Sequence, residues 1–118
     1  MKPPTVDKIM NKPVYSVDAS ELVAEAVKRM RENRTKKILV KDGSRPLGVL
    51  EQWMITENDR ERPISEMELG RFETAPKGAL LLEIKEKIMN SSAVFIYDPK
   101  EPDEFIGVLT TYDLVRAI

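Results

Sequence analysis

Neither cysteine nor histidine occurs among the 118 residues of the sequence. The absence of cysteine excludes disulfides and thiolate nucleophiles, and the absence of both residues excludes the zinc sites that are built on them. Histidine is also the most common general base near neutral pH. We therefore expect a protein that is not an enzyme and requires no cofactor. A carboxylate site for Mg²⁺, formed by Asp113, Glu51 and Asp59, is the remaining catalytic alternative.

Long apolar runs are missing too. The longest cover four or five residues, as at 78–82, whereas a membrane-spanning helix needs roughly 20. The first four residues do not open an export signal, because a polar and charged stretch follows them. The 19 basic and 20 acidic residues give a net charge of −1, so no general attraction to nucleic acid or to an anionic membrane is expected. The prediction is a cytoplasmic protein.

What the sequence does contain is an internal repeat. Residues 16–26 align without gaps on residues 74–84, and Leu-Gly-Val-Leu at 47–50 matches Ile-Gly-Val-Leu at 106–109. A short apolar segment, with Val6 in one copy and Ile64 in the other, stands at the front of each repeat. Such self-similarity indicates one structural unit present twice.

Each copy has the same order of patterns. In the first, Val23, Ala26, Val27 and Met30 follow the 3.6-residue period of a helix. Two apolar runs around a Gly-containing turn then predict a β-hairpin. The predicted elements of the first copy are a strand at 14–17, the helix, strands at 37–41 and 47–50, and a closing helix at 52–58. Those of the second copy are a strand at 72–75, a helix at 79–89, a strand at 93–97, a loop at 98–104, a strand at 105–109 and a helix that ends at 118.

The expected fold is therefore mixed α/β (α+β-like), with two β-α-β-β-α repeats at residues 6–58 and 63–118. The charged stretch 57–62 between them contains no apolar residue and is predicted to be a solvated linker. A unit of fewer than about 60 residues buries too little surface to be stable alone. We therefore expect one compact module in which the copies pack sheet to sheet about a pseudo-twofold axis.

The repeat order, the short Ile-Met segment at 9–10 and the run Gly-Val-Leu-Thr-Thr-Tyr-Asp-Leu at 107–114 resemble the cystathionine β-synthase (CBS) domain. The tandem copies resemble a CBS pair, or Bateman module, over residues 6–118. The resemblance implies a non-catalytic regulatory module that senses AMP, ADP, ATP or S-adenosylmethionine and signals to a partner. It also implies a homodimer. Because no enzyme, channel or transporter domain is present, it implies a stand-alone protein with a separate, unknown client.

The resemblance also implies a ribose and phosphate site at Thr110 and Asp113, which match the Thr and Asp of the family's Gly-x-x-Thr-x-x-Asp stretch. A carboxylate accepts hydrogen bonds from two vicinal hydroxyls, and a threonine hydroxyl donates to a phosphate oxygen. The hydroxyl of Tyr112 is able to reach the same ligand. The alternative is that Thr-x-x-Asp only caps the helix that follows.

In the family, the adenine slot of such a site comes from the opposite copy, which here corresponds to residues 9–16 and 34–38. Backbone amides in the first of these segments, which ends at Ser16, would read the purine edge, and Met10, Val14 and Ile38 would supply apolar walls. The alternative for Met10 and Val14 is that each is a core residue.

Arg34, Thr35 and Lys36 belong to the same slot, where Arg34 or Lys36 would meet the phosphates. They lie in a run, 28–41, that has seven basic residues and one acidic residue, whereas 91–104 has four acidic residues and one basic residue. The simplest interpretation is a solvated face. The functional alternatives are a polyphosphate site, a dimer contact with the acidic stretch, or a nucleic-acid patch. The lack of aromatic residues in the run disfavours nucleic acid.

The first copy departs from the family pattern, since Glu51 stands opposite Thr110 and Met54 opposite Asp113. A thioether cannot accept from ribose hydroxyls, and a carboxylate repels phosphate. One intact site and one degenerate site are therefore expected. A rival function is a structural dimerisation module with empty clefts, in which apolar residues at the helix ends form the interface, namely Trp53, Met54, Tyr112 and Leu114.

Overall fold

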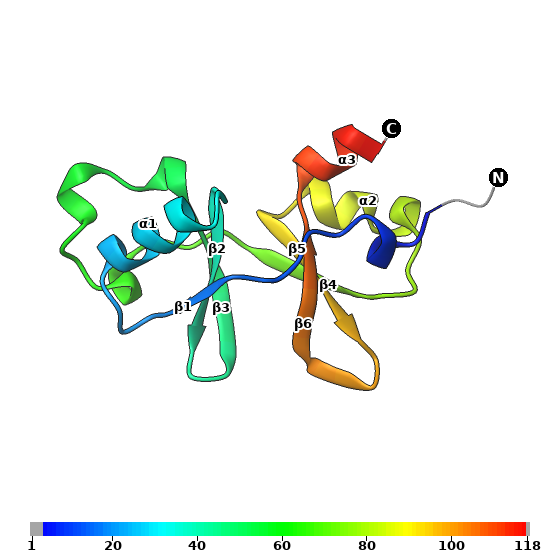
Figure 1. Ribbon diagram of the computed structural model, residues 1–118, viewed down its shortest axis with the longest axis horizontal. Coiled ribbons are helices and arrows are strands. Elements are labelled where there is room, and N and C mark those ends of the chain that lie inside the picture. The colour runs from blue at the N-terminus through cyan, green and yellow to red at the C-terminus, as the bar shows by residue number, and fades with distance from the viewer. Residues whose placement is uncertain (1–3, 118) are drawn as a thin grey trace. The chain divides into compact units, whose positions relative to one another are not determined.

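The computed structural model describes residues 4–117, and it contains two three-stranded sheets (Figure 1). In the first sheet, of order β1-β2-β3, β1 pairs in parallel with β2, and β2 pairs antiparallel with β3. A helix connects the two parallel strands β1 and β2, and its apolar stripe was predicted from the sequence. These elements are β1 (Ser16–Asp18), α1 (Val23–Glu32), β2 (Lys37–Asp42) and β3 (Arg45–Glu51).

The second sheet, of order β4-β5-β6, repeats this topology with a parallel pair and an antiparallel hairpin. Its elements are β4 (Phe72–Pro76), α2 (Leu81–Met89), β5 (Ala93–Asp98), β6 (Glu101–Leu109) and α3 (Thr111–Ala117). The duplicated mixed α/β fold is thus confirmed. No helix in the described part of the chain is long and apolar enough to cross a membrane.

Two of the predicted elements are wrong. The segment 52–58 forms two 3-10 turns, Gln52–Met54 and Glu57–Asp59, instead of one helix. The backbone N–H and the hydroxyl of Thr56 both donate to Asp59, at 2.8 and 3.0 Å, and such local bonds compete with a continuous helix. The predicted loop 98–104 is mostly strand, because Asp98 already pairs with Glu101 across a tight turn.

By their contacts, the described residues form two compact units that are cut differently from the sequence repeats. One unit runs from Tyr15 to Gly70, and the other joins the segment before Tyr15 to the chain from Arg71 onward. The N-terminal segment therefore packs with the second sheet, through hydrogen bonds from the Val6 N–H to the Ala79 carbonyl at 2.9 Å and from the Leu81 N–H to the Pro4 carbonyl at 3.2 Å.

Within the unit Tyr15–Gly70, the segment between the two repeats makes similar backbone hydrogen bonds. The first N–H groups of α1, at Val23 and Ala24, donate to the carbonyls of Arg62 and Arg60, each at 2.9 Å. These N–H groups have no partner inside the helix, so the connecting segment satisfies them. The prediction of a merely solvated linker needs this correction, because its backbone caps α1.

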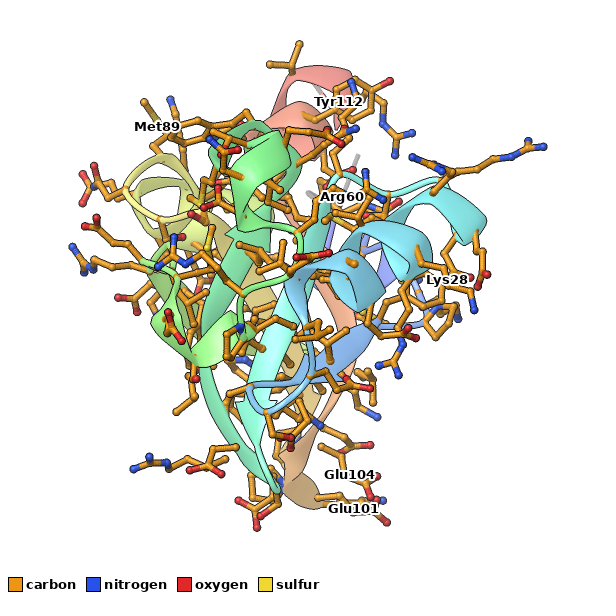
Figure 2. All side chains as sticks on the ribbon, turned by 90° about the vertical axis from the view of Figure 1, so that its left-hand side faces the viewer. Lys28, Arg60, Met89, Glu101, Glu104 and Tyr112 are labelled. Carbon is orange, nitrogen blue, oxygen red and sulfur yellow. The ribbon has the colours of Figure 1, made fainter. Side chains whose placement is uncertain are left out.

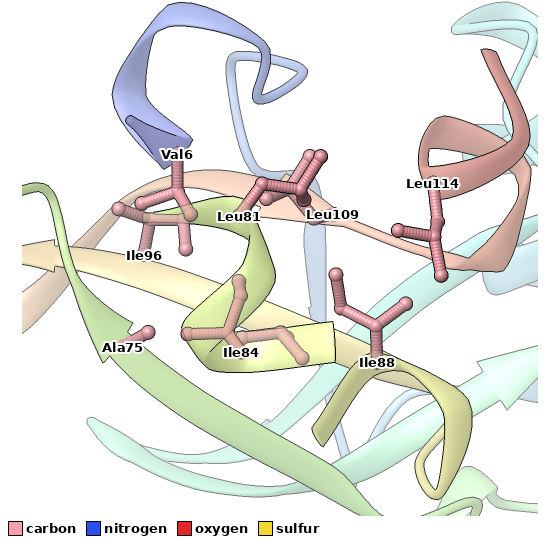
Figure 3. Close-up of a cluster of buried hydrophobic side chains, with 9 residues drawn as sticks. Val6, Ala75, Leu81, Ile84, Ile88, Ile96, Leu109 and Leu114 are labelled. Carbon is pink, nitrogen blue, oxygen red and sulfur yellow. The ribbon is translucent and has the colours of Figure 1, made fainter. Parts of the chain in front are cut away.

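Each unit has its own buried cluster on the helix side of its sheet. In the second sheet's unit, residues of α2, α3 and the strands close around a side chain from the N-terminal 3-10 turn, Val6–Lys8 (Figure 3). In the other unit, a side chain from the 3-10 turn Ile64–Glu66 has the corresponding place. The two clusters are Val6, Ala75, Leu81, Ile84, Ile88, Val94, Ile96, Leu109 and Leu114, and Val17, Ala19, Val23, Ala26, Met30, Ile38, Val40, Leu50 and Ile64.

Candidate functional site

The predicted ribose site lies where β6 ends and α3 begins. Asp113 is only 3% exposed, and its Oδ2 accepts hydrogen bonds from the Thr110 backbone N–H at 2.9 Å and the Thr110 hydroxyl at 3.3 Å. This is capping geometry, because the carboxylate satisfies an N–H group at the start of the helix. The capping alternative is therefore present in the structure. A ligand role for Asp113 and Thr110 stays a prediction.

The other oxygen of Asp113 contacts two residues that the sequence analysis missed. Its Oδ1 accepts from the Asn11 side-chain amide at 2.8 Å and lies 3.5 Å from an Arg116 guanidinium nitrogen. Asn11 is held beside β6 by backbone hydrogen bonds in both directions with Val108, each 2.9 Å long. The contact with Arg116 is one that the sequence could indicate, because Arg116 follows Asp113 by three positions on a helix. Asn11 lies 102 positions from Asp113 and has no such signal.

Tyr112 is exposed, in contrast to the buried carboxylate of Asp113. Its side chain is 69% exposed, and the Arg116 guanidinium lies 5.4 Å from the centre of its ring. This distance is within the range of a cation–π contact. Figure 2 shows Tyr112 at the outside of the molecule. The tyrosine and the arginine thus form an exposed pair next to Asp113.

Of the predicted apolar walls, Met10 and Val14 lie in the same unit as Asp113 and are half-buried, whereas Ile38 is buried in the core of the other unit. Met10 packs against the core of the Asp113 unit and fills the space over Gly107, where an added Cβ would collide with its sulfur. Met10 is therefore partly a core residue, which was the alternative to a ligand role. The residue is half-buried, and its role as an apolar wall of a ligand site stays a prediction.

The other predicted adenine-site residues belong to the unit Tyr15–Gly70. Ser16 begins β1, and its carbonyl accepts from Arg29 at 2.8 Å. Arg34 is exposed and has a positive φ of 53°, which places it in the left-handed region. Thr35 donates to the Lys37 carbonyl at 3.1 Å, and Lys36 is exposed. The set predicted from the sequence is thus divided between the two units, and its joint action stays a prediction.

At the corresponding position of the first copy, the carboxylate cap is missing. Glu51 precedes a 3-10 turn without a side-chain cap, and its carboxylate lies 3.3 Å from the Lys37 ammonium group. Met54, opposite Asp113 in the repeat, is half-buried at the end of that turn. The two copies therefore differ in local structure as well as in residue type.

Within the described residues, no three acidic side chains gather to hold a metal ion. Asp59, proposed above for Mg²⁺, is bound by Thr56 and by Arg62 at 2.9 Å. The pKa of its carboxyl is lowered, as are the pKa values of Asp18 and Asp98, and in each case the main cause is a backbone N–H of the same turn that donates to the carboxylate. These three aspartates stabilise turns.

Comparison with known proteins finds that a model of the CBS-domain family matches residues 6–60. Among curated proteins, the chain is 29% identical over 115 residues to the glycine betaine/carnitine/choline transport ATP-binding protein OpuCA of Bacillus subtilis. The match covers 96% of this chain and 30% of that protein, so the chain spans about a third of this relative's length.

Solved structures share the fold. The CBS domain pair of protein MJ0100, in complex with 5'-methylthioadenosine and S-adenosyl-L-methionine, has a TM-score of 0.77 at 21% identity, with coverage of 98% of this chain and 95% of that one. Staphylococcus aureus OpuCA has a TM-score of 0.67 at 22% identity, with coverage of 92% and 94%. At these identities the likeness shows the fold.

Proposed function

Since the chain belongs to the CBS-domain family, we propose that it is a regulatory module that binds an adenosine-containing ligand and signals its occupancy to a partner protein. The candidate ligands are AMP, ADP, ATP and S-adenosylmethionine. The observation that carries the proposal is the buried carboxylate of Asp113, held beside Thr110 at the end of β6. The presence of 5'-methylthioadenosine and S-adenosylmethionine in the MJ0100 structure supports the adenosine class.

The chemistry of these residues suits a nucleoside. The Asp113 carboxylate accepts from both ribose hydroxyls, and the Thr110 hydroxyl donates to a ligand oxygen. Met10 and Val14 offer half-buried apolar surface to a purine. Arg116, whose guanidinium is exposed on the outer side of α3, is a cation that a phosphate would attract. Arg34 and Lys36 are further candidates for the phosphates of a longer nucleotide.

A thermal-shift screen with AMP, ADP, ATP and S-adenosylmethionine tests the proposal. A ligand that binds only the folded protein raises its melting temperature, by an amount that grows with ligand concentration. We expect at least one of the four to do so, and expect Asp113→Asn to reduce the shift. Glu104→Gln is a matched control, because this acidic residue of the same unit is exposed on β6. No shift with any ligand would contradict the proposal and favour the purely structural module.

The partner is the second part of the proposal. The Bacillus subtilis relative is a transport ATP-binding protein, which supports a transport ATPase as the class of partner. We also propose a homodimer, because α2 and α3 expose large apolar side chains. Leu82 is 74% exposed, Met89 59%, Val115 72% and Tyr112 69%. Figure 2 shows Met89 and Tyr112 at the outside of the molecule. Leu114, predicted for this interface, is buried in the core instead.

Sedimentation velocity over a range of micromolar concentrations tests the dimer. We expect a mass of twice 13.5 kDa, and expect Met89→Lys with Val115→Lys to give a monomer, because apolar surface that is exposed in the monomer drives association. The matched control is Ser44→Lys, which adds the same charge at an exposed polar residue of the other unit and removes no apolar surface. A wild-type monomer at every concentration would contradict this part.

A further inference from the structure

We propose that the Asn11 side chain is an internal competitor for the adenosine ligand, so that the Asp113 carboxylate accepts ribose hydroxyls only after this amide has been displaced. The inference rests on the proposed function and adds its regulation. Asn11 occupies Oδ1 of Asp113 at 2.8 Å, and the two residues are 102 positions apart. No local helix or turn requirement explains such a contact.

The capacity of the carboxylate supports this inference. An ionised carboxylate has about four acceptor sites, two on each oxygen. On Asp113, the Thr110 N–H and hydroxyl donate to Oδ2, Asn11 donates to Oδ1, and the Arg116 guanidinium lies 3.5 Å from Oδ1 as an ion pair. The side chain is only 3% exposed, so water has little access to it. A ligand hydroxyl therefore reaches this carboxylate only when an internal donor moves aside.

Of the four donors, Asn11 is the one whose displacement matters. The Thr110 N–H bond belongs to the cap of α3 and would persist with the helix, and the Thr110 hydroxyl bond is long, at 3.3 Å. Arg116 is 3.5 Å away and its side chain is 56% exposed, so its ion pair with Asp113 is weak. The Asn11 bond to the charged carboxylate is the shortest of the group, at 2.8 Å, so its displacement costs the ligand the most.

The backbone of Asn11 allows the exchange. Two backbone hydrogen bonds, one donated by each residue, pair Asn11 with Val108, and Asn11 is exposed to solvent. The amide is therefore able to leave Asp113 by side-chain rotation while the main chain stays paired to β6. Ligand binding would then break the side-chain hydrogen bond that joins Asn11 to the α3 cap. By reciprocity, a partner that holds Asn11 on Asp113 would weaken ligand binding.

Calorimetric titration of wild type, Asn11→Ala and the control Asn90→Ala with each of the four ligands tests the inference. Asn90 is an exposed asparagine of the same unit, at the end of α2. Removal of the competitor should tighten binding about tenfold in Asn11→Ala, the equivalent of one hydrogen bond to a charged group, and leave Asn90→Ala unchanged. Binding by Asn11→Ala alone, without wild-type binding, would also support the competitor.

Equal or weaker binding in Asn11→Ala, with wild type still binding, would overturn the competitor and leave the proposed function intact. Binding by neither protein would overturn both. The Asn11 side-chain NH₂ resonances provide a second readout, with Asn11→Ala used for their assignment. They should shift when a ligand saturates the wild type, because the amide loses its carboxylate partner, and unchanged resonances at saturation would overturn the inference.

Discussion

Val6 and Ile64 stand at the front of the two sequence repeats, yet each is buried in the cluster of the other repeat's sheet. Both have 0% exposure, Val6 among residues of β4–β6 and Ile64 among residues of β1–β3. Each comes from a 3-10 turn that leads into the next element. Each sequence repeat therefore packs its leading segment against the sheet of the other repeat.

This exchange predicts where a core mutation acts. Ile64→Ala removes a fully buried side chain and should lower the free energy of unfolding by about 2–5 kcal/mol. The variant should lose amide hydrogen-exchange protection mainly in β1–β3, because Ile64 packs there. Val6→Ala should act on β4–β6 instead. If Val6→Ala lowered protection mainly in β1–β3, the exchange of segments would be wrong.

A glycine substitution tests close packing in the first sheet. A Cβ at Gly48 would lie 2.7 Å from the Leu69 Cβ and 3.0 Å from the Gly70 carbonyl oxygen, whereas one at Gly78 meets nothing within 4 Å. Gly48→Ala should therefore destabilise the protein by about 1–3 kcal/mol in urea unfolding. Gly78→Ala is the matched control and should be close to neutral. Equal stability of the two variants would contradict the packing.

Acid should weaken the turn that Asp18 holds. Its carboxylate accepts from the Ser20 N–H and hydroxyl and from the Gly43 N–H, and these bonds lower its pKa. A pKa that is lower in the folded state stabilises the protein above the ordinary carboxyl pKa, and this stability is lost as the pH falls below about 4. Asp18→Ala should therefore destabilise the protein at pH 7 and much less at pH 2. A pH-independent difference in urea unfolding would exclude this role.

The asymmetry of the copies predicts one ligand per chain. Glu51 and Met54 replace the groups that would meet phosphate and ribose, and each replacement costs on the order of 1–3 kcal/mol of binding. Calorimetry should give a stoichiometry of one, and Glu51→Thr with Met54→Asp should raise it towards two. Two equivalents of equal affinity in the wild type would show that the first copy is not degenerate.

The sequence alone was sufficient to predict the elements with strong periodicity. The stripe of Val23, Ala26 and Met30 became the buried face of α1, and the paired apolar runs became both hairpins. In the segment 52–58, local bonds at Thr56 overrode the expected helix. Such bonds depend on the geometry of a few side chains, which periodicity does not contain.

The candidate site was only partly predictable for a different reason. Thr110 and Asp113 stand in one short motif, but the motif has the same form for a cap and for a ligand site. The partner of Asp113 at Oδ1, Asn11, comes from the opposite end of the sequence. Its position depends on the packing of the N-terminal segment beside β6, and no pattern within one repeat indicates which sheet that segment joins.

The most direct test of the regulatory account is the affinity of Asp113 variants for AMP, ADP, ATP and S-adenosylmethionine, measured by calorimetric titration. Asp113→Asn keeps the shape of the side chain, and Asp113→Ala removes it; circular dichroism checks that both remain folded. We predict that both bind the ligand of the wild type more weakly, by about 1.5–3 kcal/mol for Asp113→Ala, while Glu104→Gln binds as the wild type does. Unchanged affinity in folded Asp113→Ala would contradict the account.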